Sequence, residues 1–355
     1  MTSLVPSPVA VTGASGFIGS WIVKHLLDQG VTVHGTVRSL KQKDRVEHLE
    51  ELGAKSAGTL KLFEAELRES GGFAAAFASC KVVMHVASPF RIQGVRNAQE
   101  DLIAPAVSGT RNVLQAVNEC STVERVVLTS SVAAIHGDSA EHAGQALNET
   151  MWNGVSSPSY QPYAYSKMLA EREAWRIAEG QSRWRLVTIN PGFVTGPTLS
   201  KRVDGTSMDL MLQLVDGRAK RGVPDIRLGV VDVRDVARAH LLAAVLADAE
   251  GRHIVSNQVM SFPEIAAMLR EIYGDRYPIP RSTLSKALLY LVGPFLGFSW
   301  RYVRRNVGLP VQIDNSKAQK ALGLTYLPIR DTLKDCIDQL ATMGLIERKP
   351  GRHQA

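Results

Sequence analysis

The chain has 355 residues, of which 45% are hydrophobic and 21% are charged, a balance typical of a folded globular protein and not of a disordered one. Its 41 basic and 34 acidic side chains leave a net charge of +7, but the basic residues are dispersed and form no known nucleic-acid-binding motif, which excludes nucleic acid as an expected partner. Three widely spaced cysteines form no CxxC pair, and no signal-peptide pattern is present, so we expect a cytoplasmic protein without a disulfide framework.

The first half of the chain alternates short β-branched runs with longer helical patterns. Strands are predicted at 8–12, 31–37, 59–64, 82–87, 124–130 and 184–190. Helices are predicted at 17–29, 42–52, 98–118 and 163–179. This alternation predicts an α/β fold with a doubly wound parallel sheet of the Rossmann type, whose ligand lies beyond the carboxyl ends of the strands.

The pattern changes after Pro191, where strand-like runs become scarce. Helices are expected from Asp232 to about 247, after the capping box of Ser261 and Glu264, and at 331–343. We therefore predict a smaller, mostly helical C-terminal substrate lobe. The nucleotide-binding Rossmann domain is expected at 1–191 with about 229–257, and the substrate-binding lobe at about 192–228 and 258–355.

Residues 284–300 form an apolar run that is interrupted by Lys286 and by Gly293 and Pro294. The run is shorter than the about 20 apolar residues of a membrane-spanning helix. We interpret it as protein interior and expect no stable membrane insertion. Contact with a membrane surface is the alternative.

A glycine-rich turn joins the first predicted strand to the first predicted helix. Gly13, Gly16 and Gly19 recur at three-residue spacing, which lets the backbone turn tightly and approach a pyrophosphate at the helix N-terminus. The spacing is GxxGxxG and differs from the common GxGxxG fingerprint. The position of the turn nevertheless predicts a dinucleotide site.

The end of the second predicted strand favours NADPH over NADH. An acidic residue at this point would bind the ribose 2′-hydroxyl of NAD, whereas arginine accommodates a 2′-phosphate. Here Arg38 ends the strand, Arg45 follows, and no carboxylate lies between them. Because guanidinium groups suit phosphate, the sequence predicts NADPH/NADP as cofactor.

Tyr163 and Lys167 are four residues apart near the start of a predicted helix that begins at Pro162, and this spacing places them on one helix face. A nearby ammonium should lower the pKa of the Tyr163 phenol and suit it to general acid catalysis. In addition, Thr129, Ser130 and Ser131 end the fifth predicted strand. A hydroxyl at that point could donate a hydrogen bond to a substrate carbonyl.

These segments together resemble the extended short-chain dehydrogenase/reductase family, in particular its dihydroflavonol 4-reductase and cinnamoyl-CoA reductase branch. The matching segments cover roughly the first 200 residues in order: VTGASGFIGSWIV (11–23), TVR (36–38), HVASPF (85–90), LTSSVA (128–133), YAYSK (163–167) and NPGFVTGP (190–197). The resemblance implies that Ser131 positions the carbonyl, Tyr163 donates the proton, and Lys167 tunes Tyr163 and holds the ribose. It implies an NADP-dependent reduction of an aldehyde or ketone to an alcohol.

The resemblance also implies a set of cofactor-binding residues. They are Gly13, Ser15, Gly16, Phe17, Ile18, Arg38, Arg45, Glu66, Leu67, Val86, Ala87, Ser88, Thr129, Tyr163, Lys167, Pro191 and Val194. Members of the family occur as monomers or as homodimers packed through the helices at 98–118 and 163–179, and we expect one of these states here.

The chain departs from the family pattern at three points. Glu66 replaces the usual aspartate near the adenine. His136, a candidate substrate contact, replaces an asparagine of plant dihydroflavonol reductases, which argues against a flavonoid substrate. Gln161 and Pro162 replace the Asn-Trp pair of cinnamoyl-CoA reductases, which argues against a CoA thioester.

Three alternatives stay open at this point, because a fold alone does not fix a function. The first is a hydroxysteroid dehydrogenase. The second is a nucleotide-sugar epimerase or dehydratase, although dehydratases usually carry Asp-Glu where Ser130 and Ser131 follow Thr129. The third is a non-catalytic NADP-sensing protein. The nine scattered histidines show no metal-binding spacing, so we expect no metal.

Overall fold

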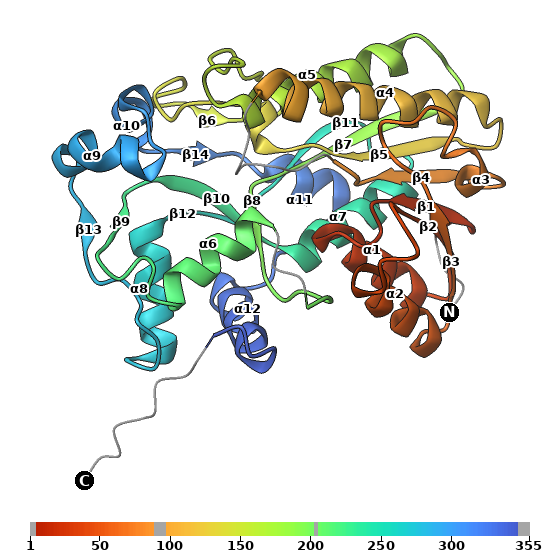
Figure 1. The fold of residues 1–355 in the computed structure, drawn as a ribbon. Coiled ribbons are helices and arrows are strands. Elements are labelled where there is room, and N and C mark those ends of the chain that lie inside the picture. Colours follow the sequence, from red (N-terminus) through yellow and green to blue (C-terminus); the bar gives the residue numbers. More distant parts are fainter. Residues whose placement is uncertain (1–4, 89–96, 202–204, 347–355) are drawn as a thin grey trace.

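A computed structural model describes residues 5–88, 97–201 and 205–346 of the chain. Its main sheet has seven strands in the spatial order β11-β7-β5-β4-β1-β2-β3 (Figure 1). All six neighbouring pairs are parallel. The strands are β1 (Val9–Thr12), β2 (Thr32–Val37), β3 (Thr59–Glu64), β4 (Val82–His85), β5 (Arg125–Thr129), β7 (Arg185–Pro191) and β11 (Gly251–Val255). The predicted doubly wound parallel sheet is confirmed.

Helices cover both faces of this sheet (Figure 1). On one face lie the short α3 (Ala74–Phe77), α4 (Ala104–Glu119), which a π-helical turn (Gln99–Ile103) precedes, and α5 (Pro162–Glu179). On the other lie α1 (Phe17–Asp28), α2 (Lys43–Lys55), α7 (Val233–Val245) and α11 (Ser316–Leu322). Because both faces are covered, the central strands are apolar and buried along their length, as β1 and β4 are.

The second half contains more strands than the sequence predicted. A three-stranded sheet joins β8 (Phe193–Thr195), β10 (Arg227–Asp232) and β12 (Gln258–Ser261). Two-stranded pairs join β13 (Thr283–Leu284) to β9 (Val223–Pro224) and β14 (Gln312–Ile313) to β6 (Ala146–Leu147). These strands are two to six residues long, too short for an alternating pattern to stand out.

The helices of the C-terminal lobe are α6 (Thr206–Val215), α8 (Phe262–Tyr273), α9 (Lys286–Val292), α10 (Trp300–Asn306) and α12 (Ile329–Thr342), with 3-10 turns at Val132–Ala134 and Gly293–Leu296. The predicted capping box is present, because Ser261 Oγ accepts from the Glu264 amide and the Glu264 carboxylate accepts from the Ser261 amide. Asp232 caps α7 by accepting from the Arg234 amide, also as predicted.

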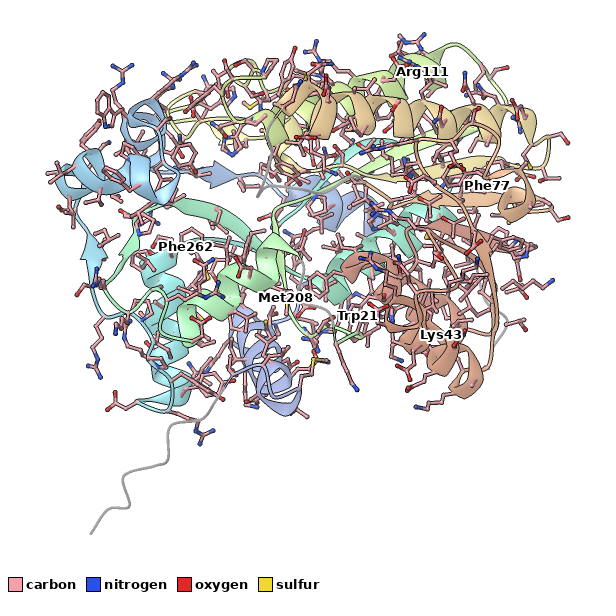
Figure 2. All side chains as sticks on the ribbon, viewed as in Figure 1. Trp21, Lys43, Phe77, Arg111, Met208 and Phe262 are labelled. Carbon is pink, nitrogen blue, oxygen red and sulfur yellow. The ribbon has the colours of Figure 1, made fainter. Side chains whose placement is uncertain are left out.

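The hydrophobic core is divided among clusters that match this layering. One cluster lies between the sheet and α1, α2 and α7, and another between the sheet and α3, α4 and α5. A third unites α6, α8 and α12. Figure 2 shows Phe77 of the second cluster and Phe262, which packs against the third, at opposite ends of the molecule.

The interior interpretation of residues 284–300 is wrong. Leu288, Leu291, Phe295, Leu296 and Trp300 are exposed. The run folds into α9, a 3-10 turn and the start of α10, and within it only Leu289 and Gly293 are buried. Within the described residues, no helix is both long and apolar enough to cross a membrane.

Candidate functional site

The glycine-rich turn leaves the β1 strand end close to the neighbouring β4 strand. Gly13 has φ of 66°, a conformation that L side chains rarely adopt, and a Cβ there would lie 2.8 Å from Ala87 Cα. A Cβ at Gly19 would lie 2.2 Å from the Gly13 carbonyl oxygen. Because Gly16, the residue before α1, offers no side-chain cap, the helix presents its first amides to an anion.

Thr12, which sequence reasoning missed, ties the ends of β1 and β4 together. Its Oγ1 accepts from the Val86 and Ala87 amides, each at 3.1 Å, and lies 2.8 Å from His85 Nδ1. Burial lowers the pKa of His85 to about 3, so this imidazole is neutral and its Nδ1 can accept a hydrogen bond from the Thr12 hydroxyl. His85 is thus a satisfied core histidine that fixes the edge of the nucleotide site.

A cavity of about 420 Å³ opens at the carboxyl ends of the central strands, and its size is typical of a small-molecule site. It brings together most of the predicted site residues from both halves of the sheet. These are Gly13, Ser15, Gly16, Phe17, Ile18, Arg38, Arg45, Leu67, Val86, Ala87, Ser88, Thr129, Ser131, Tyr163, Lys167, Pro191 and Val194. Two predicted residues, Glu66 and His136, do not line it.

Arg38 lies on the cavity wall just after β2, and Arg45 on the first turns of α2. The Arg38 Nε atom is 3.8 Å from the Glu66 Oε2 atom, and the Arg38 side chain is largely exposed. Glu66 therefore pairs with the arginine predicted to bind the 2′-phosphate and does not face the cavity. This solvent-screened pair is weak, so it leaves Arg38 available to a phosphate.

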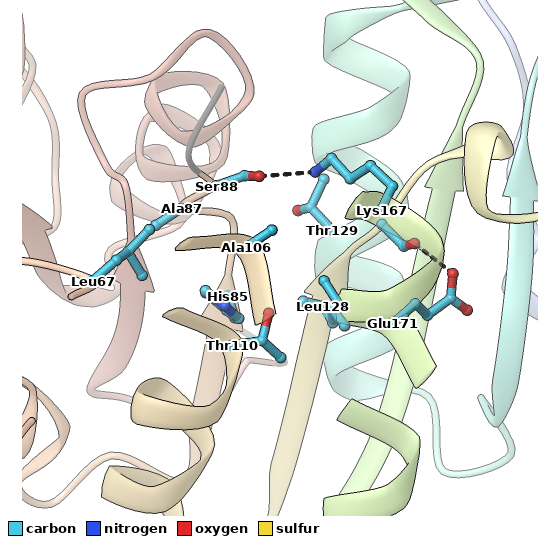
Figure 3. A pocket seen from close by; sticks show the side chains of 12 residues that line it. Leu67, His85, Ala87, Ser88, Ala106, Thr110, Leu128, Thr129, Lys167 and Glu171 are labelled. Carbon is cyan, nitrogen blue, oxygen red and sulfur yellow. Dashed lines mark hydrogen bonds between the residues drawn. The ribbon is translucent and has the colours of Figure 1, made fainter. Parts of the chain in front are cut away.

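Ser131, Tyr163 and Lys167 converge in the cavity, the serine from the turn after β5 and the other two from α5. Ser131 and Tyr163 share a side-chain hydrogen bond, and Lys167 Nζ lies 6.0 Å from the centre of the Tyr163 ring. Lys167 Nζ also donates to Ser88 Oγ at 3.1 Å (Figure 3). The neighbouring Ser130 also lines the cavity but donates its hydroxyl to Glu171, which leaves Ser131 as the serine that hydrogen-bonds the tyrosine.

The pKa values of this group differ from the sequence-based expectation. Burial raises the pKa of Tyr163 to about 12, against a smaller lowering by the Ser131 hydrogen bond. Burial lowers the pKa of Lys167 to about 8, against a raising effect of Glu171. The expected lowering of the Tyr163 pKa is therefore wrong for this structure, because loss of solvent dominates it.

Glu171 is the centre of a buried polar network under Lys167, one helical turn along α5. Its carboxylate accepts from Arg252 Nε at 2.6 Å and from Asn190 Nδ2 at 2.8 Å. The Arg252 guanidinium also stacks on the Trp152 ring at 3.9 Å. Sequence reasoning missed Glu171, although its four-residue spacing from Lys167 places it on the same helix face.

A second, small cavity lies between this network and the strand ends (Figure 3). Its volume is about 20 Å³, enough for roughly one water molecule. Six residues line both cavities, and Lys167 and Ser88 are among them. Lys167 thus stands between the large cavity and a polar interior.

Asp138, also missed from the sequence, fixes the segment that leads into Tyr163. Its buried carboxylate accepts from Tyr160 Oη and Gln161 Nε2, each at 2.7 Å, and from Arg305 and Asn306 of α10. Burial would raise the pKa of Asp138, but these hydrogen bonds hold it below its ordinary value. One aspartate therefore joins the loop after Ser131, the start of α5 and the C-terminal lobe.

Comparison with known proteins identifies one family. The sequence model of the NAD dependent epimerase/dehydratase family matches residues 9–256. The chain is 36% identical to cinnamoyl-CoA reductase CAD2 of Medicago truncatula, over 94% of this chain and 95% of the relative. It is 35% identical to tetraketide alpha-pyrone reductase 1 of Arabidopsis thaliana, over 95% and 96%.

Solved structures extend the likeness. The yeast methylglyoxal/isovaleraldehyde reductase Gre2, complexed with NADPH, superposes with a TM-score of 0.78 at 28% identity, and the match covers 95% of this chain and 99% of that one. The match includes the C-terminal lobe, which the sequence motifs did not reach. Together, these relatives confirm the resemblance drawn from the motifs.

Proposed function

Since the chain belongs to the NAD dependent epimerase/dehydratase family, that of the extended short-chain dehydrogenases/reductases, and is an oxidoreductase, we propose that it reduces the carbonyl group of a small aldehyde or ketone with NADPH. The observation that carries the proposal is the convergence of Ser131, Tyr163 and Lys167 in one cavity with the glycine-rich turn. Its relatives' names describe reductases.

The residues of the cavity suit an NADPH molecule. The uncapped start of α1 would hold the pyrophosphate, Arg38 and Arg45 the 2′-phosphate, and Lys167 a ribose hydroxyl. When bound, NADPH supplies a hydride from C4 of its nicotinamide. Pro191 and Val194, at the end of β7 and on β8, line the same cavity and would border that ring.

Tyr163 supplies the proton in this proposal. With a pKa of about 12, the phenol keeps its proton at neutral pH and can donate it to the carbonyl oxygen as negative charge develops there. Ser131 hydrogen-bonds the same region and orients the oxygen. The Lys167 ammonium stabilises the phenolate that remains after the transfer.

We further propose that the two parts of the chain bind different ligands. Residues 1–191 with about 229–257 would bind NADPH, and about 192–228 with 258–355 would bind the substrate. Residues of the second part also line the cavity, which supports this division; they include Gly192, Ser200, Ser207 and Met208. We also propose a cytoplasmic location, because Cys80, Cys120 and Cys336 are free thiols.

An epimerase or dehydratase is disfavoured by the residues after Thr129. Dehydratases carry Asp-Glu at these positions, whereas this chain carries Ser130 and Ser131 and has no carboxylate there. Ser130 donates a hydrogen bond to Glu171, and Ser131 shares one with Tyr163. A hydroxysteroid dehydrogenase would use the same chemistry on a bulkier substrate. NADPH consumption with a panel of short aldehydes, ketones, steroids and CoA thioesters separates these activities. The proposal would be contradicted if the protein consumed NADPH with none of the carbonyl compounds in the panel.

Arg38→Gln is expected to weaken NADPH binding about tenfold to a hundredfold, the effect of losing a charged hydrogen bond, and to leave NADH binding unchanged. Fluorescence titration with both cofactors measures the difference. The matched control is Lys55→Gln, which removes an exposed positive charge from the far end of α2 and should affect neither cofactor. If Arg38→Gln weakened the binding of NADPH and NADH equally, the arginine would contact a part of the nucleotide other than the 2′-phosphate.

The kcat/KM for NADPH is expected to fall as the pH rises through about 8, the pKa of Lys167. Burial lowers this pKa, so the ammonium that the proposal requires is present below pH 8 and is lost above it. A pH profile of initial rates at low NADPH concentration tests this expectation. A profile that stays flat through this range, or falls only on the acid side, would contradict the role of the lysine.

A further inference from the structure

The segment 276–313 forms an apolar tip with basic flanks that the reductase proposal does not use. Figure 1 shows α9 and α10 at the end of the molecule opposite α1, α2 and α3. The exposed fractions of Leu291, Phe295, Leu296 and Trp300 are 74%, 90%, 56% and 65%. Together with Leu288 and Tyr290, these side chains form what we call the apolar tip.

Hydrogen bonds and a small core cluster hold the backbone of the apolar tip in place. Trp300 Nε1 donates to the Tyr290 carbonyl at 2.9 Å, which ties α10 to α9 while leaving the indole exposed. Lys286 Nζ donates to the Arg304 and Val307 carbonyls. Behind the tip, Leu289 and Val303 pack into a small core cluster with Ile226. The exposed side chains therefore do not fold back onto their own lobe.

The charged side chains within the segment 276–313 are all of one sign. Residues 276–313 contain six arginines and lysines and no aspartate or glutamate. Arg281 pairs with Asp275 and Arg305 with Asp138. Among the described residues, Lys286, Arg301 and Arg304 have no carboxylate partner in an ion pair. The apolar tip is therefore flanked by uncompensated positive charge.

We propose that the apolar tip docks on the surface of a membrane that contains anionic lipids. Leucine and aromatic side chains on short helices insert at the boundary between headgroups and acyl chains, and flanking arginines and lysines contact the headgroups. Aromatic residues such as Trp300 and Tyr290 prefer this boundary. A second copy of the chain is disfavoured as the occupant, because a two-fold contact through this patch would bring like charges together.

Vesicle flotation of the full chain tests the proposal without measuring turnover. We expect the protein to float with vesicles of mixed phosphatidylcholine and phosphatidylserine, more weakly with phosphatidylcholine alone, and less well as salt rises. Leu291→Ser with Phe295→Ser should reduce binding about tenfold per side chain. Arg304→Gln should reduce binding to the anionic vesicles about fivefold.

The control is Leu345→Ser, which makes the same change at an exposed leucine outside the apolar tip and should bind like the wild type. All these variants should keep normal NADPH consumption, because none of the replaced residues lines the cavity. Two results would overturn the proposal. One is no flotation of the wild type with anionic vesicles. The other is a wild-type dimer that Leu291→Ser with Phe295→Ser dissociates, without vesicle binding.

Discussion

Tyr163→Phe is expected to lower kcat/KM for carbonyl reduction by about a hundredfold to ten-thousandfold, the range by which a positioned general acid speeds a reaction. The substitution removes only the hydroxyl that shares a hydrogen bond with Ser131. NADPH binding should remain, because the glycine-rich turn and Arg38 are untouched. Initial rates of NADPH consumption and a separate NADPH titration distinguish the two effects.

The matched control for this substitution lies on the same helix. Tyr165 is two residues further along α5 and does not line the cavity. Tyr165→Phe should therefore leave the rate close to that of the wild type. Wild-type activity in Tyr163→Phe would remove Tyr163 from the proposed mechanism.

Glu171→Gln is expected to lower the free energy of unfolding by about 3–5 kcal/mol, as is typical when one partner of a buried ion pair is removed. The side chains of Arg252 and Glu171 are 7% and 0% exposed. The glutamine would leave the Arg252 guanidinium buried without a counter-charge, although its volume is nearly that of glutamate. Urea unfolding followed by circular dichroism gives the free energy.

Glu51→Gln provides the comparison for the buried pair. Glu51 pairs with Lys55 four residues along α2, and both side chains are exposed, so Glu51→Gln should leave the free energy of unfolding nearly unchanged. If Glu171→Gln destabilised the protein no more than Glu51→Gln, the network under Lys167 would not be a source of stability.

Local sequence patterns predicted the fold and the large cavity well. The parallel sheet follows from strand and helix alternation, and the glycine-rich turn from three glycines at the end of the first strand. Tyr163 and Lys167 could be paired because four residues make about one helical turn. Each of these inferences needs only residues that are close in sequence.

The parts that could not be predicted depend on contacts between distant segments. Arg252 reaches Glu171 from β11, and Arg305 reaches Asp138 from α10, separations that no local pattern encodes. The predicted burial of residues 284–300 is wrong for a related reason. An apolar composition favours burial, but burial also requires a neighbouring surface, and the described part of the chain places none over Leu291 and Phe295.

The central claim, that the large cavity holds NADPH with its reactive end beside Tyr163 and Lys167, is tested most directly by a crystal structure of the NADP complex. The account predicts the pyrophosphate at the start of α1, the 2′-phosphate against Arg38, and the nicotinamide facing Tyr163. A cofactor bound with its nicotinamide away from Tyr163 and Lys167 would contradict it.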